Sequence, residues 1–208
     1  MAIEIELKAW VSNPQELRTK LSSLAVFKGT FEKNDVFFDH VCLEEAKGIP
    51  NYGVRVRQET FVYPDGNQKE LSLVTYKIKE LRDNIEVNEE KEFEVSSGEA
   101  FIEFLLHLGF RERIRKQKKG GSYDYNGMNV ELTRVEDLGW FIEMEILLSQ
   151  RDDEKIENER MRLLDFLDRL EIGRNSIESR SYSVMLAENI PQYNSPLNES
   201  PRGGAASR

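Results

Sequence analysis

The 208-residue sequence contains one cysteine and two histidines. A lone thiol, Cys42, cannot form an internal disulfide, and no Cys or His cluster has the spacing of a zinc site. His40 and His107 have no partners at ligand spacing, so we assign both a structural or surface role. These absences exclude a disulfide scaffold and a zinc module, and they favour a reducing, cytoplasmic compartment.

Long apolar runs and an excess of positive charge are also missing. No segment approaches the roughly 20 apolar residues of a membrane helix, and no basic-then-apolar signal segment opens the chain. The formal net charge of −9 argues against general nucleic-acid binding, which usually needs a positive surface. We therefore expect a soluble protein, monomer or homodimer, with neither a membrane nor a nucleic-acid partner.

The length suits a single domain, predicted here over residues 1–187. From residue 188 onward the chain is rich in Asn, Ser, Pro and Gly. That composition predicts a disordered tail over residues 188–208.

Repeated alternation of apolar and charged residues dominates the rest of the sequence. Residues 3–8 alternate with period two, which indicates a strand with one apolar and one charged face. Further strands are predicted at 31–39, 54–57, 74–79, 90–95, 111–118, 122–134 around an Asn-Gly turn, and 141–147. Helices are predicted after Asn13 with Leu17, Leu21 and Leu24 on one face, at 98–109, and at 152–170 with Ile156, Met161, Leu164, Phe166 and Leu167 on one face. A loop is expected at 43–50 and a short last element at 176–187.

The charges on these strands are sorted by sign. Single-sign groups occur at Arg55 and Arg57, at Lys77 and Lys79, at Glu90, Glu92 and Glu94, and at Glu143 and Glu145. Like charges two residues apart repel, so each group needs compensation from another strand or from a ligand. An α+β fold, with a closed antiparallel β-barrel around a charged lumen and helices packed outside, satisfies both faces. Such a lumen suits a polyanion, because basic side chains grip phosphoryl oxygens and paired carboxylates bind Mg²⁺ or Mn²⁺.

Glu4, Glu6 and Lys8 form an ExExK pattern on the first predicted strand. Later segments follow it in a recognisable order: Arg55-Val56-Arg57, the basic strand with Lys77 and Lys79, the acidic strand with Glu92 and Glu94, Leu138 to Glu145, and the closing Ser181-Tyr182. From about residue 2 to 187 the chain resembles the CYTH superfamily of triphosphate tunnel metalloenzymes. That superfamily includes class IV adenylyl cyclases, thiamine triphosphatases and inorganic triphosphatases.

The resemblance implies a role for particular residues. Glu4, Glu6 and Lys8 would be catalytic, and the metal ligands would be Glu4, Glu6, Glu143 and Glu145. The triphosphate would be held by Lys8, Arg55, Arg57, Lys77, Lys79, Lys116 and Lys118. The last two come from a match of residues 114–118 to the family's VxKxR strand. Simple alternation with Ile114 facing outward would instead select Arg113 and Arg115.

One position departs from the family pattern. Relatives often carry Asp where this chain has Thr133. Glu131 lies two residues earlier with the same strand parity, and we hypothesise that it compensates for the missing carboxylate.

Three functions fit the resemblance. In the first, a metal-dependent enzyme hydrolyses inorganic, nucleoside or thiamine triphosphate. In the second, a class IV adenylyl cyclase converts ATP to cyclic AMP and diphosphate. Related cyclases carry a His-Phe pair before ExExK, and only Met1, Ala2 and Ile3 precede it here, which favours hydrolysis. The third is a non-catalytic nucleotide or polyphosphate sensor, disfavoured because the full acidic set is present.

Overall fold

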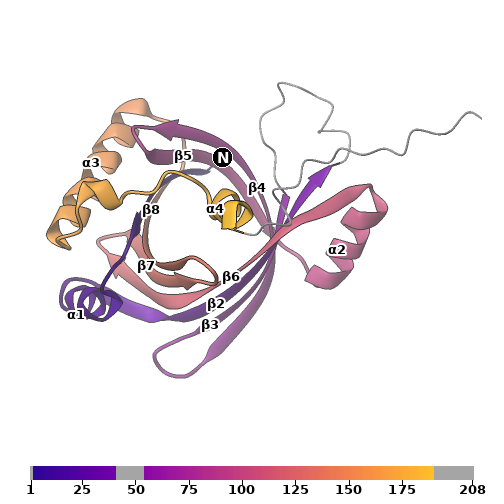
Figure 1. Ribbon diagram of the computed structural model, residues 1–208, viewed down its shortest axis with the longest axis horizontal. Helices are drawn as coiled ribbons and strands as arrows, with labels where there is room; N and C mark the ends of the chain where they lie inside the picture. The colour runs from indigo at the N-terminus through magenta and orange to yellow at the C-terminus, as the bar shows by residue number, and fades with distance from the viewer. Residues whose placement is uncertain (1, 41–53, 190–208) are drawn as a thin grey trace, which may run out of the picture.

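The computed structural model describes residues 2–40 and 54–189 and has a closed antiparallel barrel at its centre (Figure 1). The order around the barrel is β1-β5-β4-β3-β2-β6-β7-β8, and β8 pairs back onto β1. The strands are β1 Ala2–Trp10, β2 Val26–His40, β3 Val54–Val62, β4 Gln68–Arg82, β5 Ile85–Glu94, β6 Phe110–Tyr125, β7 Met128–Val135 and β8 Gly139–Leu148. The predicted α+β class and closed barrel are confirmed.

Local sequence fixes the tight turns between neighbouring strands. Asp83 and Asn84 join β4 to β5 with φ values of 46° and 65°, and Asn126 and Gly127 join β6 to β7 with 51° and 81°. Two consecutive positive φ values are the geometry of the two-residue hairpin turn whose twist matches the strands. These residue types therefore set the register in which each pair of strands meets.

Four α-helices lie within the described residues: α1 Pro14–Leu24, α2 Gly98–His107, α3 Asp153–Arg169 and α4 Tyr182–Asn189. The side chains of Asn13, Ser97 and Asp152 cap the first three by accepting a hydrogen bond from a backbone N–H of the first turn. In Figure 1, α1, α2 and α3 lie outside the barrel, whereas α4 lies within its outline. None of the described helices is long and apolar enough to cross a membrane.

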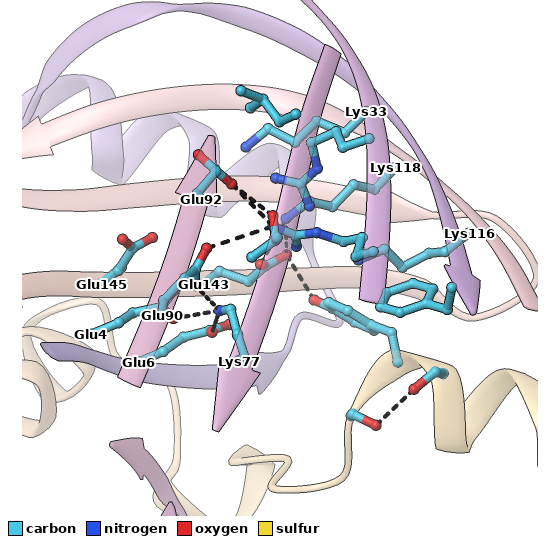
Figure 2. A pocket seen from close by; sticks show the side chains of 18 of the residues that line it. Glu4, Glu6, Lys33, Lys77, Glu90, Glu92, Lys116, Lys118, Glu143 and Glu145 are labelled. Atoms are coloured by element: carbon cyan, nitrogen blue, oxygen red, sulfur yellow. Dashed lines mark hydrogen bonds and ion pairs between the residues drawn. The ribbon is translucent and has the colours of Figure 1, made fainter. Parts of the chain in front are cut away.

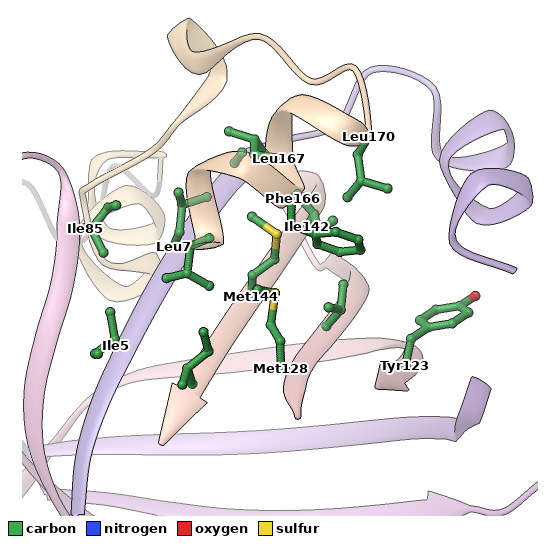
Figure 3. Close-up of a cluster of buried hydrophobic side chains, with 14 of the residues drawn as sticks. Ile5, Leu7, Ile85, Tyr123, Met128, Ile142, Met144, Phe166, Leu167 and Leu170 are labelled. Carbon is green, nitrogen blue, oxygen red and sulfur yellow. The ribbon is translucent and has the colours of Figure 1, made fainter. Parts of the chain in front are cut away.

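The main hydrophobic core lies outside the barrel wall, between the strands and the helices. Ile5 and Leu7 of β1 are fully buried there, and Phe166 and Leu167 of α3 pack over the same wall (Figure 3). Because side chains alternate along β1, the same strand sends Glu4, Glu6 and Lys8 to the opposite face, into the barrel.

The prediction for α3 needs one correction. Met161, predicted on the apolar face, is 47% exposed, and Leu163 is fully buried instead. The buried face also includes Arg160, whose guanidinium binds the Arg82 carbonyl and the Asp83 carboxylate at the β4–β5 turn. Because the charged Arg160 lies on the core face, the apolar residues alone did not show which face of α3 is buried.

Two further boundaries differ from the prediction. Residues 110–125 form one strand, not two, because Gly120 and Gly121 continue the ladder to β7. A Cβ at Gly120 would lie 2.1 Å from the Leu132 carbonyl oxygen, so the close approach of β7 requires glycine there. Helix α4 continues to Asn189, two residues past the predicted domain end. The predicted loop at 43–50, Cys42, the His40 side chain and residues 190–208 lie outside what the structure describes.

Candidate active site

The inward side chains of the barrel surround a cavity of about 460 Å³. Ten of its lining residues are acidic and eight are basic. The acidic residues are Glu4, Glu6, Asp39, Glu59, Glu86, Glu90, Glu92, Glu131, Glu143 and Glu145, and the basic residues are Lys8, Lys33, Arg55, Arg57, Lys77, Arg113, Lys116 and Lys118. The cavity therefore carries a formal excess of carboxylates.

The two signs are concentrated on opposite sides of the cavity. Strands β8, β1 and β5 are neighbours and carry most carboxylates, which we call the acidic wall. Strands β3, β2 and β6 are neighbours and carry most cations, which we call the basic wall. Figure 2 shows Glu4, Glu90 and Glu145 facing Lys116 and Lys118 across the open space. The sign-sorted strands of the sequence are thus brought together by the strand order.

Lys77 of β4 lies among the carboxylates of the acidic wall. Its ammonium contacts Glu4, lies 2.7 Å from Glu90 and is 3.9 Å from Glu6. Burial alone would lower the pKa of Lys77, but these three carboxylates raise it above its usual range. Lys77 therefore stays charged and neutralises part of the acidic wall.

Glu145 has no such neutralising contact. Within residues 2–40 and 54–189 no hydrogen bond or ion pair reaches its carboxylate, which lies beside Glu4 and Glu6 (Figure 2). Burial, followed by the charges of Glu4 and Glu6, raises the pKa of Glu145 to about 8. The pKa of Glu6 is raised for the same reasons, burial first and Glu4 second. The acidic wall is short of positive charge at this point.

Asp35 of β2 and Glu131 of the adjoining strand β7 each lie within 3.0 Å of two cations of the basic wall. Asp35 accepts from Arg57 Nε at 2.6 Å and Nη2 at 3.0 Å and lies 2.8 Å from the Lys116 ammonium. Glu131 accepts from Lys33 at 2.6 Å and from Lys118 at 3.0 Å. Burial would raise the pKa of Glu131, but Lys118 and Lys33 lower it below its usual range. These contacts engage Glu131 with cations and leave it ionised.

The two glutamates of β8 face different surroundings. Glu143 accepts hydrogen bonds from Lys118 at 2.7 and 2.9 Å and from Tyr182 Oη at 2.8 Å. Despite burial, Lys118 lowers the pKa of Glu143. Glu143 is therefore tied to the basic wall, whereas Glu145 belongs with Glu4 and Glu6.

Strand β6 supplies its cations through a β-bulge. The pairing with β2 shifts between Phe37 and Phe38, where Arg113 is the extra residue. Lys116 and Lys118 face the cavity, as the motif match predicts, and the bulge brings Arg113 to the cavity as well. Arg115 faces outward and pairs with Glu112. Simple alternation was therefore wrong for Arg115 and right for Arg113.

The closing segment of the chain contacts the cavity from one end. Lys8 donates a hydrogen bond to the Arg180 carbonyl at 2.6 Å, and its ammonium lies 4.5 Å from the centre of the Tyr182 ring. Ser181, Tyr182 and Ser183 line the cavity beside it. The predicted closing motif thus belongs to the same site as Lys8.

Other predicted residues are placed as follows. Arg55 lines the cavity and donates to Thr75 at 2.7 Å and to Glu92 at 3.4 Å. Thr133 is fully buried and donates to the Lys119 carbonyl at 3.5 Å, and it does not line the cavity. The Lys79 side chain is outside the described part of the structure.

Sequence reasoning did not assign Lys33 or Glu90 to the site, and it missed Asp35, which is buried behind the cavity lining between Arg57 and Lys116. Lys33 and Asp35 lie on a strand whose two faces both carry apolar residues, since Phe31 and Phe37 point inward with them while Val36 and Phe38 are buried outside. Without a clean alternation, only the pairing of β2 with β3 and β6 reveals which face is internal. Glu90 had a signal, because it has the parity of Glu92.

Several known proteins are similar to this chain. A protein of Methanocaldococcus jannaschii named as a candidate adenylate cyclase is 26% identical over 183 residues, which are 86% of this chain and 96% of that protein. Two solved proteins of Pyrococcus horikoshii have TM-scores of 0.76 and 0.70 with 27% and 29% identity, covering 89% and 87% of this chain and 98% of each of theirs.

A solved candidate adenylyl cyclase of Hippeastrum, described as having a dominant triphosphatase activity, is 17% identical with a TM-score of 0.62. The match covers 93% of this chain and 99% of that one, and at this identity it shows a shared fold alone. The model of the CYTH domain matches residues 2–182, which include every strand of the barrel. With the barrel, the two charged walls and this match in agreement, the chain belongs to the CYTH domain family.

Proposed function

We propose that this protein binds a triphosphate compound between the acidic and basic walls and hydrolyses it with the help of Mg²⁺ or Mn²⁺. The observation that carries the proposal is the opposition of two walls of unlike charge across one cavity. A volume of about 460 Å³ lies within the roughly 300–1,000 Å³ of typical small-molecule sites. The cavity has room for a triphosphate with an organic group attached.

The basic wall and Lys8 would hold the phosphoryl oxygens. Arg57 of β3 offers a planar pair of donors. Lys116 and Lys118 offer point charges on β6, which β2 separates from β3. Nearly all the work of phosphoryl transfer is positioning and charge neutralisation, which is what such an array supplies. The charges held by Arg55 and Arg57 on β3 would neutralise the leaving phosphate.

The acidic wall fits a divalent cation by chemistry and charge. Glu4, Glu6 and Glu145 are hard oxygen ligands of the kind Mg²⁺ and Mn²⁺ prefer, and Glu145 lacks a cationic partner among the described residues. No three acidic or histidine side chains in the described ranges already enclose a metal-sized space. Lys77, which contacts Glu4, would have to shift as the metal binds.

A bound divalent cation would supply positive charge against the triphosphate and lower the pKa of a coordinated water. The residues of the chain then have separate tasks. The basic wall orients the phosphoryl chain, and the carboxylates of the acidic wall exclude other anions from the attacking side by repulsion. Water attacks the terminal phosphorus, the bond to the bridging oxygen breaks, and phosphate leaves together with the remaining diphosphate, which keeps any organic group it carries.

An adenylyl cyclase is the second candidate. The similar protein of Methanocaldococcus jannaschii bears that name, and the same cavity would accept ATP. In that reaction the ribose 3′-hydroxyl attacks the α-phosphorus and diphosphate leaves, so the triphosphate must bind with the α-phosphorus at the acidic wall.

One set of assays separates these functions. Purified protein is incubated with inorganic triphosphate, ATP or thiamine triphosphate and Mg²⁺ or Mn²⁺, and phosphate, diphosphate and cyclic AMP are measured. Phosphate release supports the proposal, cyclic AMP as the main product replaces it with the cyclase, and tight binding without any product supports a sensor. Glu4→Gln and Glu6→Gln should abolish turnover, whereas Glu154→Gln, on the exposed side of α3, should not.

A further inference from the structure

Asp35 is the most deeply buried carboxylate of the basic wall. Its side chain has 0% exposure, and it does not line the cavity, although Arg57 and Lys116 on either side of it do. Strand pairing explains this arrangement, because Asp35 of β2 is directly opposite Arg57 of β3 and Lys116 of β6. Asp35 therefore cannot touch a ligand in the cavity, but it touches two residues that can.

The hydrogen bonds of Asp35 leave particular donors available. Oδ1 and Oδ2 accept from Nε and Nη2 along one edge of the Arg57 guanidinium, at 2.6 and 3.0 Å. Arg57 Nη1 is 3.8 Å from Glu59, beyond hydrogen-bonding distance. The Lys116 ammonium, which has three donor protons, forms an ion pair with Asp35 at 2.8 Å. One edge of each cation is thus anchored, and other donors remain for an anion.

Stability does not require an ionic trio at this position. Buried ion pairs can often be replaced by apolar residues of similar volume without loss of stability, because desolvation offsets their attraction. The trio instead fixes orientation, since a carboxylate that binds a guanidinium through two parallel hydrogen bonds holds its plane. Without Asp35, Arg57 and Lys116 would repel each other across the width of one strand.

We propose that Asp35 is a positioning residue that holds Arg57 and Lys116 as a preformed pair of donors for phosphoryl oxygens. The proposal rests on the proposed triphosphate site. Asp35 acts through its two partners and contacts no substrate atom.

The test is a double-mutant cycle on the binding of inorganic triphosphate, measured by calorimetry with Mg²⁺ present. Arg57→Lys removes the planar fork and should weaken binding roughly tenfold in the wild-type background, the size expected for one lost bidentate charge-assisted contact. In an Asp35→Asn background the fork is no longer held in place, so the same substitution should weaken binding by less than about twofold.

Asp39→Asn is the matched control. Asp39 lies on the same strand four residues later and pairs with Arg113 at 3.6 Å, not with Arg57. In an Asp39→Asn background, Arg57→Lys should again weaken binding roughly tenfold. If Asp35→Asn does not fold, Asp35→Asn/Lys116→Met removes one charge of each sign and serves as the second background.

An equal effect of Arg57→Lys with and without Asp35 would overturn the proposal, because a purely structural aspartate changes stability but not this coupling. Melting temperatures of the same variants measure the effect on stability separately from the effect on the binding coupling. Because the cycle needs binding and not turnover, a wild-type protein that binds triphosphate without hydrolysing it would contradict the proposed reaction and leave the Asp35 test readable.

Discussion

Replacing Glu131 by Gln should destabilise the protein through the loss of one buried charge. Glu131 bridges Lys33 at 2.6 Å and Lys118 at 3.0 Å inside the cavity wall. Removing one partner of a buried ion pair costs about 3–5 kcal/mol, because the other charge stays buried without compensation. Lys118 retains Glu143 at 2.7 Å, and glutamine keeps one acceptor oxygen, so we expect a loss at or below the lower end of this range, about 2–3 kcal/mol.

For a chain of this length such a loss lowers the melting temperature by roughly 4–12 °C. Chemical denaturation at pH 7 with a thermal melt would measure both quantities. Inorganic triphosphate should restore more stability to the variant than to the wild type, since phosphoryl oxygens would replace the missing carboxylate beside Lys33 and Lys118. A Mg²⁺ titration on the same sample tests whether Glu131 also contributes to metal binding.

Glu145→Gln, in the same cavity, should not destabilise the protein as Glu131→Gln does. A carboxyl with a folded pKa of about 8 binds more protons in the folded than in the unfolded state between about pH 4.5 and 8, so stability falls as the pH rises through that window. By pH 7 the accumulated cost for Glu145 is on the order of 3 kcal/mol. Glutamine removes it, so this variant should be no less stable than the wild type. A loss below 1 kcal/mol in Glu131→Gln, or an equal loss in both variants, would refute the account of the two walls.

Three other predictions follow from single residues. Metal binding at pH 7 should release close to one proton, because Glu145, with a pKa of about 8, is mostly protonated in the metal-free protein. The affinity for the metal should therefore rise from pH 6 to 8. Calorimetry in two buffers measures the proton release, which Glu145→Gln should abolish. Burial lowers the pKa of Lys116 to about 7, and the nearby cations, which outweigh Asp35, contribute to this shift. When triphosphate binds without metal at pH 8, the wild type should therefore take up close to one proton, and Lys116→Met should take up none. Gly120→Ala should lower the unfolding free energy by roughly 2–4 kcal/mol, because its Cβ would meet the Leu132 carbonyl at 2.1 Å; a melt within 2 °C of the wild type would contradict this.

Local pattern was sufficient for much of the fold. Strict alternation in β1 and β8, the Asn126-Gly127 turn and the helical spacing after Asn13 each predicted the element that the structure has. Prediction failed where two signals conflicted. The prediction ended one strand at 118 and began the next at 122, but Gly120 and Gly121 between them permit close strand pairing. On α3, the buried face includes Arg160, so the apolar residues alone did not identify it.

Part of the site could be predicted from the alternation of side chains along single strands. Glu4, Glu6 and Lys8 alternate with apolar residues on a strand that has one buried outer face, so their direction follows from the period of the strand. Lys33 and Asp35 could not be identified, because apolar residues occupy both faces of β2. Alternation misplaced Arg115 because Ile114, which pairs with the cavity-lining Phe37, lies on the same face as Lys116 and Lys118. The bulge at Arg113 then reverses the parity of the residues before it.

The sequence by itself determined that several strands carry sorted charges on one face, because side-chain direction alternates along any strand. Only the tertiary structure decided which strands become neighbours, and hence that β8, β1 and β5 form an acidic wall facing a basic wall from β3, β2 and β6. The pairings of Asp35 with Arg57 and Lys116, and of Glu131 with Lys33 and Lys118, join residues from different strands. Such contacts depend on register and barrel closure, which are set by the packing of the whole chain and not by any single segment.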